Sequence, residues 1–238
     1  MNNLIVFDID GTLIHYIDCE DNAYVDSINS VTGIDKINTK WEDYPYSTES
    51  GILSEIFYHA LKRKPEDTEL FSIKDKYVSY LSNHIRHAPN SLQCIPGARN
   101  VFNMAKENNW DVAIATGGWH ESAVMKLDNA EIPHHNIPMS HAGDHFERKD
   151  IIMTAVSRAK HFYNKNHYHQ ITYVGDRLWD LKATQTLGID FIGVGKHLGS
   201  LKHRNFFHID DYETNGFIGY LKSFASHYKI LENMSHTA

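Results

Sequence analysis

Near the N-terminus the chain reads Leu4-Ile5-Val6-Phe7-Asp8-Ile9-Asp10-Gly11-Thr12-Leu13, four apolar residues followed by two aspartates and a glycine. A short apolar run that stops at turn residues is typical of a strand buried on both faces of a parallel sheet. Similar runs cover residues 112–115, 171–174, 191–194 and 206–209. Helical segments are expected between them, over 98–108, 150–163 and 178–187, with a last helix over 214–231. This alternation predicts an α/β fold with a Rossmann-like, doubly wound parallel sheet.

Residues 15–93 interrupt the alternation, because they contain no convincing buried strand. Their pattern instead predicts helices over 19–32, 47–61 and 65–87, with Gly33 ending the first and Pro89 following the third. We therefore expect an all-helical domain, 15–93, inserted into a core domain made of 1–14 and 94–238.

Composition excludes several classes of protein. The chain has 238 residues and a formal charge of −7, so it has no general attraction for nucleic acid or anionic membranes. No apolar run is long enough to span a bilayer. Cys19 and Cys94 are the only cysteines, and the N-terminus has no signal-peptide pattern, so reduced thiols and a cytoplasmic location are expected. Pairs among the 17 histidines, such as His134-His135 and His167-x-His169, lack the further ligands of a zinc site and are expected at the surface.

Polar residues follow the apolar runs where each strand ends. In an open α/β sheet, the carboxyl ends of the strands meet at the ligand-binding edge. Asp8 and Asp10 share a face of an extended strand, and neighbouring carboxylates repel unless a cation lies between them. Mg²⁺ fits such oxygen ligands and leaves positions for a substrate phosphate. The residues expected to meet are Asp8, Asp10, Thr116, Gly117, Asp176 and Asp180.

Three of these segments resemble motifs of the haloacid dehalogenase superfamily. Asp8-Ile9-Asp10-Gly11-Thr12-Leu13 is similar to its first motif, Thr116 after an apolar strand to its second, and Gly175-Asp176-Arg177-Leu178-Trp179-Asp180 to its fourth. The helical insertion falls where the C1 cap domain of that family lies. The resemblance is to the C1-capped branch that includes phosphoglycolate phosphatase and β-phosphoglucomutase.

The resemblance implies a role for each residue. Asp8 would attack phosphorus and form an aspartyl phosphate, while Asp10 would act as general acid and then general base. Asp8, Asp10 (through its carbonyl), Asp176 and Asp180 would hold Mg²⁺. The Thr116 hydroxyl and the Gly117 amide would bind the phosphoryl group. The cation beside the phosphate is expected to be Lys149, with its neighbour Arg148 as the alternative.

The family supports several reactions, so the fold does not decide the chemistry. Metal-free dehalogenases of the family lack an acidic residue at the position of Asp10, which favours phosphoryl transfer here. Phosphonate hydrolysis would need a cap lysine, and no motif marks Lys36, Lys40, Lys62 or Lys64 for that role. The leading expectation is a phosphatase acting on a small phosphate ester. A phosphomutase and a non-enzymatic phosphate-binding module are the alternatives, and the sequence predicts no oligomeric state.

Overall fold

A six-stranded, all-parallel sheet forms the centre of the protein. The computed structural model describes residues 2–201 and 205–224. The strands are arranged in the order β3-β2-β1-β4-β5-β6. Their bounds are Asn3–Phe7 for β1, Trp110–Ala115 for β2, Met139–Ser140 for β3, Gln170–Gly175 for β4, Asp190–Val194 for β5 and Phe207–Ile209 for β6.

Strand β1 lies inside the sheet and pairs with β2 on one side and β4 on the other. Its side chains alternate between two buried layers, which explains why it reads as a continuous apolar run. Ile5 and Phe7 face a layer completed by α4 (Val101–Glu107), α5 (His120–Asn129) and a helix over 215–224. Leu4 and Val6 face the opposite layer, which contains α6 (Arg148–Phe162), α7 (Leu178–Leu187) and α8 (Gly195–Gly199).

The expected α/β fold is confirmed, and the differences concern short elements and helix ends. The predicted helix over 98–108 begins as a 3-10 turn, Ala98–Asn100, and continues as α4. Strand β3 has only two residues, which is too short for a periodicity to mark it. Helix α6 begins at Arg148 rather than at residue 150. The predicted last helix is present over 215–224, and the rest of that prediction lies outside the described residues.

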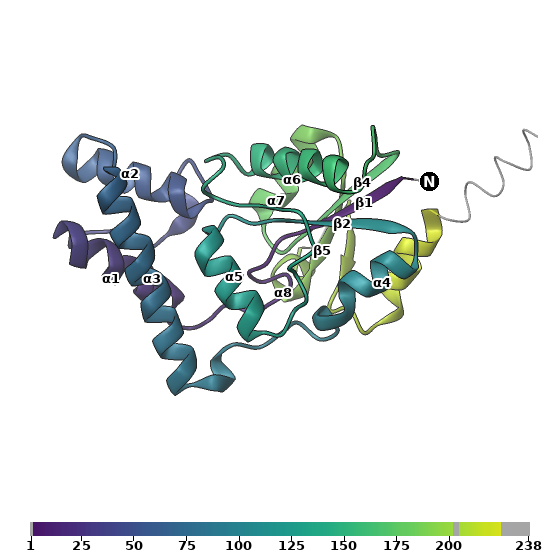
Figure 1. Cartoon of the computed structure of the whole chain (residues 1–238), viewed down its shortest axis with the longest axis horizontal. Helices are drawn as coiled ribbons and strands as arrows, with labels where there is room; N and C mark the ends of the chain where they lie inside the picture. The colour runs from purple at the N-terminus through teal and green to yellow at the C-terminus, as the bar shows by residue number, and fades with distance from the viewer. Residues whose placement is uncertain (1, 202–204, 225–238) are drawn as a thin grey trace, which may run out of the picture.

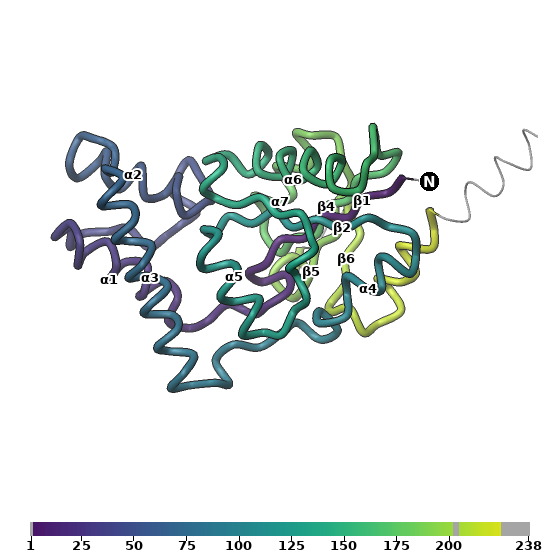
Figure 2. The backbone as a smooth tube through the Cα atoms, viewed as in Figure 1, coloured from purple at the N-terminus to yellow at the C-terminus, as the bar shows by residue number. Residues whose placement is uncertain are grey.

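Three helices form the insertion between β1 and β2: α1 (Glu20–Thr32), α2 (Glu49–Leu61) and α3 (Asp67–His87). They lie at the end of the molecule opposite the N-terminus, beyond the carboxyl ends of the strands (Figures 1 and 2). The chain enters and leaves the insertion through adjacent segments, since His15 donates its amide to the Gln93 carbonyl and Ile14 bridges to Cys94. We call residues 15–93 the cap.

The apolar cluster of the cap includes two residues from the sheet domain. Trp119 and Ala142 are buried with Tyr24, Phe57 and Tyr77 in this cluster. Trp119 donates its indole N–H to the Ser50 hydroxyl at 2.7 Å and its amide to the Glu49 carboxylate at 2.6 Å. The cap is therefore attached to the core through shared packing as well as through its two connecting segments.

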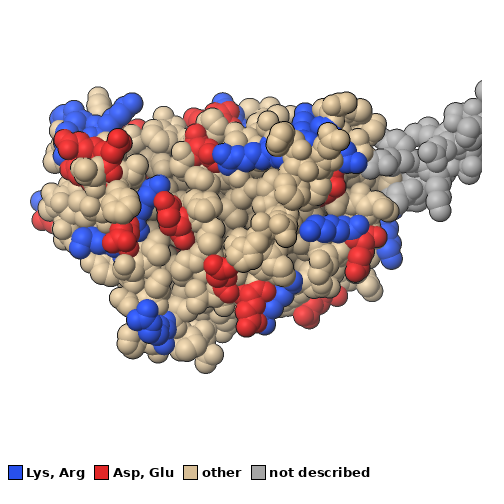
Figure 3. Space-filling view, in the orientation of Figure 1, with Lys and Arg blue, Asp and Glu red and all other residues tan. Residues whose placement is uncertain are grey.

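The cysteines, the hydrophobicity of the helices and the surface charge can be compared with what the composition predicts. Cys19 and Cys94 are free thiols. Within residues 2–201 and 205–224, no helix is long and apolar enough to cross a membrane. The face of the molecule in Figure 3 carries basic and acidic side chains interspersed with each other.

Candidate active site

A cavity of about 990 Å³ separates the carboxyl ends of the strands from the cap. Asp8 follows β1 directly, and Thr116 follows β2. Both line the cavity, together with Asp10, Gly117 and side chains from α1 and from the segment between α1 and α2. The first and second motifs, which are more than 100 residues apart in sequence, thus meet at one edge of the sheet.

Asp8, which lines the cavity, belongs to a group of three carboxylates. Asp8, Asp176 and Asp180 each offer an oxygen, and these atoms lie within 4.8 Å of one another. All three residues are buried. The amide of Arg177 orients Asp180 by donating to its Oδ2 at 3.1 Å. The fourth motif therefore adds two carboxylates to the one that follows β1.

The environment disfavours charge on these acids. Burial raises the pKa of Asp8 to about 7, although Arg148 opposes the shift; Asp180 and Asp10 add to it. Burial and the neighbouring Asp180 raise the pKa of Asp176 well above its usual range. Burial also raises the pKa of Asp180. A bound cation would relieve this cost.

The residues present fit a magnesium ion. Asp176 Oδ1 is buried and has no hydrogen-bond partner, so a ligand atom is available beside Asp8 and Asp180. Gly11 has a φ of +74°, and a Cβ there would overlap the Asp176 carboxylate. Only glycine allows the chain to turn this closely past the acids. An all-oxygen set of carboxylates is the chemistry that Mg²⁺ prefers.

Arg148 contacts the carboxylates directly. Its Nη1 lies 3.3 Å from Asp8 Oδ1, its Nε lies 3.5 Å from Asp180 Oδ1, and its side chain is buried. Lys149 lines the same cavity but forms no ion pair with Asp8, Asp176 or Asp180. Successive residues of a helix point about 100° apart, so Arg148 and Lys149 at the start of α6 point in different directions. The structure thus brings Arg148, the alternative cation, against Asp8 and Asp180 and places Lys149 in the lining of the cavity.

Asp10 lies in a second charged cluster, between the core and the cap. Lys126 of α5 places its Nζ 2.6 Å from Asp10 Oδ1 and also bonds Glu20 of α1 at 2.5 Å. Burial lowers the pKa of Lys126, but the negative charges of Asp10, Glu20 and Glu49 have the larger combined effect, so the pKa is raised. Burial raises the pKa of Glu49 to about 8. A buried ammonium group thus holds the Asp10 side chain.

The sequence reasoning missed Lys126, Glu20 and Glu49. A partial signal exists, because Lys126 lies on the stripe of α5 that also carries the buried Ala123 and Leu127. A charge on an apolar stripe indicates a buried partner. Its partners are 106 and 116 residues away in sequence, so their identity could not be read from the pattern.

Thr116 is buried, and its hydroxyl oxygen accepts a hydrogen bond from the Gly118 amide at 3.1 Å. That bond leaves the hydroxyl proton available for a group in the cavity. A Cβ at Gly117 would lie 2.7 Å from Arg148 Nη2, so a side chain at position 117 would displace the arginine.

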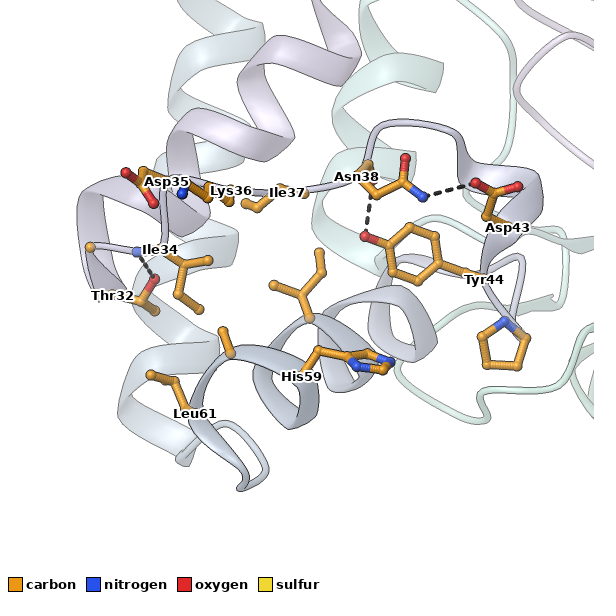
Figure 4. Close-up of a pocket in the computed structure, with 14 residues that line it drawn as sticks. Thr32, Ile34, Asp35, Lys36, Ile37, Asn38, Asp43, Tyr44, His59 and Leu61 are labelled. Atoms are coloured by element: carbon orange, nitrogen blue, oxygen red, sulfur yellow. Dashed lines mark hydrogen bonds between the residues drawn. The ribbon is translucent and has the colours of Figure 1, made fainter.

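Two other features carry candidate ligand-binding groups, and the first adjoins the cavity through Tyr44 and Pro45, which line both. A hollow of about 600 Å³ within the cap is lined by the segment after α1 and by the end of α2, and the polar groups of Asn38, Asp43 and Tyr44 in it bond one another (Figure 4). Asp128, His134 and His135 form a second group of possible metal ligands. His135 is exposed, as expected for these histidines, whereas His134 is buried.

The model of the haloacid dehalogenase-like hydrolase family matches residues 5–194. The chain therefore belongs to this family of hydrolases. A search of curated protein sequences gave no match.

Solved structures share the fold at low identity. β-Phosphoglucomutase from Clostridium difficile is 20% identical, with 93% of this chain and 99% of that chain covered and a TM-score of 0.64. CbbY from Rhodobacter sphaeroides in complex with phosphate is 18% identical, with 91% and 97% covered and a TM-score of 0.62. A predicted phosphoglycolate phosphatase from Haemophilus somnus is 15% identical, with 94% and 98% covered and a TM-score of 0.59. At these identities the likeness concerns the fold.

Proposed function

We propose that this protein is a Mg²⁺-dependent phosphatase that hydrolyses a small phosphate monoester through an aspartyl phosphate on Asp8. The observation that carries the proposal is the grouping of Asp8 with Asp176, Asp180 and Arg148, while Asp10 lies two residues further along. A nucleophilic carboxylate, a cation and metal-binding oxygens are the components that phosphoryl transfer needs.

Asp8 attacks phosphorus, and the bond from phosphorus to the ester oxygen breaks. Asp10 donates a proton to the departing oxygen and later removes one from the water that attacks the aspartyl phosphate. Lys126 holds the Asp10 side chain in a fixed position for both transfers. The Thr116 hydroxyl donates a hydrogen bond to the transferring oxygens, and Arg148, which lies beside Asp8, supplies positive charge.

Asp8, Asp176, Asp180 and the Asp10 carbonyl would hold Mg²⁺. When bound, the ion supplies positive charge to the phosphoryl oxygens and offsets repulsion between the phosphate and Asp8. We assign Arg148 as the cationic side chain beside the phosphate, because it pairs with Asp8. Lys149 is assigned to the rim of the cavity.

Other reactions of the family have less support. Asp10 would have no task in a metal-free dehalogenation. A Schiff-base phosphonatase needs a cap lysine at the cavity, and among residues 15–93, all of which are described, none of the lysines lines it. The cytoplasmic location expected from the cysteines remains part of this proposal.

Phosphate release from p-nitrophenyl phosphate, with and without Mg²⁺, tests the function. We expect turnover only with the metal, and Asp8→Asn should lower kcat by about 10³-fold or more while the fold is retained. Folded, Mg²⁺-saturated protein that releases no phosphate from this ester or from a panel of phosphorylated metabolites would refute the proposal. Formation of an isomeric sugar phosphate without release of phosphate would instead identify a phosphomutase.

A further inference from the structure

We infer that the substrate is a phosphate ester whose alcohol part carries a cationic amine, recognised by the acidic and aromatic face that the cap turns toward the cavity. The inference rests on the proposed phosphatase function and concerns the part of the substrate that leaves with the ester oxygen.

Charge is divided unequally between the two sides of the cavity. The lysines and arginines in its lining are Arg148, Lys149, Arg177 and Lys182, and all four belong to the core. Within the fully described residues 15–93, no lysine, arginine or histidine lines the cavity. The carboxylates that the cap contributes are Asp18, Glu20, Asp21, Glu42 and Glu49.

Only part of this acidic set is neutralised by neighbours. Lys126 bonds Glu20 and lies beside Glu49, which accounts for the two deeper carboxylates. Asp18, Asp21 and Glu42 are exposed in the wall of the cavity. Low-dielectric walls of one sign of charge raise the local concentration of ions of the opposite sign.

Aromatic rings complete the cap side of the cavity. Trp41 packs between Tyr24 and Tyr44, with ring centroids 5.8 and 6.0 Å away. Asp21 accepts a hydrogen bond from the Trp41 indole at 2.8 Å, which fixes the ring beside a carboxylate. Aromatic faces next to carboxylates bind ammonium groups through cation–π attraction and direct charge pairing.

Two of the four core cations in the lining, Arg148 and Arg177, are paired with acids near the reacting centre, and Lys149 and Lys182 lie on the core side of the cavity. Arg148 pairs with Asp8 and Asp180. Arg177 pairs with Asp176 at 3.1 Å and stacks on Tyr16, with its guanidinium carbon 4.6 Å from the ring centre. A second phosphate or a carboxylate on the leaving group would therefore face acids without a cap cation to bind it. This arrangement disfavours bisphosphates and phosphorylated carboxylic acids as substrates.

A matched series of esters tests the inference. The substrates are 2-aminoethyl phosphate, 2-hydroxyethyl phosphate, carboxymethyl phosphate and ethane-1,2-diyl bisphosphate, with p-nitrophenyl phosphate as the assay for phosphatase activity itself. We expect kcat/KM for the aminoethyl ester to exceed that of the carboxymethyl ester and of the bisphosphate by about tenfold or more. The hydroxyethyl ester should fall between them.

If p-nitrophenyl phosphate is hydrolysed but the aminoethyl ester is no better than the hydroxyethyl or either anionic ester, the inference fails and the phosphatase function stands. If neither these five esters nor the panel of phosphorylated metabolites is hydrolysed, both fail.

Charge reversal in the cap gives a second test. Asp18→Lys should reduce the preference for the aminoethyl over the carboxymethyl ester by about fivefold or more. Glu42→Lys should also reduce this preference, and it provides the test if Asp18→Lys does not fold. Asp26→Lys is the matched control, because Asp26 is an exposed cap carboxylate outside the cavity lining. An unchanged preference in both cavity variants, or an equal change in the control, would overturn the inference.

Discussion

The ammonium group of Lys126 lies 2.6 Å from the carboxylate of Asp10, and the lysine side chain has no exposed surface. The same ammonium bonds Glu20, so one buried cation connects the proposed acid–base residue to the first helix of the cap. Removing one member of a buried ion pair leaves the others without compensation, which is costly.

Lys126→Met should therefore act on both stability and catalysis. We expect a loss of about 3–5 kcal/mol in the free energy of unfolding. In the folded fraction, kcat should fall by about 10²-fold or more with KM nearly unchanged, since Asp10 loses its positioning residue. Urea unfolding and steady-state kinetics measure the two effects. Lys106→Met, at an exposed position of α4, is the control. Wild-type kcat in Lys126→Met would show that the lysine has only a structural role.

Arg148 and Lys149 form a matched pair of adjacent cations. Because Arg148 contacts Asp8 and Asp180, Arg148→Met should lower kcat by about 10²–10³-fold. Lys149→Met removes a cation from the rim and should cost about threefold or less. Kinetics with p-nitrophenyl phosphate compare the variants, and circular dichroism checks that both are folded. If Lys149→Met is the inactive variant, the lysine predicted from the sequence is the site cation after all.

The dependence of stability on Mg²⁺ should change with pH. Burial raises the pKa of Asp8 from 3.8 to about 7 in the metal-free protein, and it raises the pKa of Asp176 in the same direction. Between these pKa values the folded protein holds a proton on Asp8 that the unfolded chain has released. The stabilisation of the folded state by the protonated acids is therefore fully present below about pH 4, and it is lost as the pH rises through 7. Mg²⁺ replaces those protons above pH 7.

Excess Mg²⁺ should accordingly raise Tm by about 5 °C at pH 8 and by much less at pH 5.5. Thermal unfolding followed by circular dichroism at both pH values measures the shift. Asp176→Asn removes a proposed ligand and should abolish most of the increase at pH 8. An equal shift at both pH values, or an unaltered shift in this variant, would contradict the assignment of the metal site.

Trp119 joins the cap to the core, since it is fully buried in the cap cluster and bonds Ser50 and Glu49. Trp119→Ala should lower the free energy of unfolding by about 3–5 kcal/mol through the cavity it leaves. Phe71→Ala removes an aromatic ring that is 72% exposed on α3, and it should cost about 0.5 kcal/mol or less. Denaturant unfolding of both variants measures the difference. Equal effects would mean that the shared cluster contributes little to holding the cap.

Local patterns predicted the elements that are long and periodic. The apolar run of β1 could be recognised because a strand buried on both faces needs apolar side chains at every position. Helix α7 was predicted with its observed bounds, since Gly188 adopts the left-handed conformation that ends it. Strand β3 was missed because two residues carry no periodicity. Helix α6 begins two residues earlier than predicted, at Arg148.

The sequence alone determined the order of the longer strands and helices along the chain, the helical insertion after β1, and the acids that follow β1 and β4, because each depends on residues close together in the chain. Tertiary structure decided which cation faces Asp8, that Lys126 binds Asp10, and that the cap presents carboxylates and aromatic rings to the cavity. Those outcomes depend on side-chain directions and on contacts between residues that are more than 100 positions apart. No local pattern encodes them, since the free energy of a buried charge depends on which distant partner folding brings beside it.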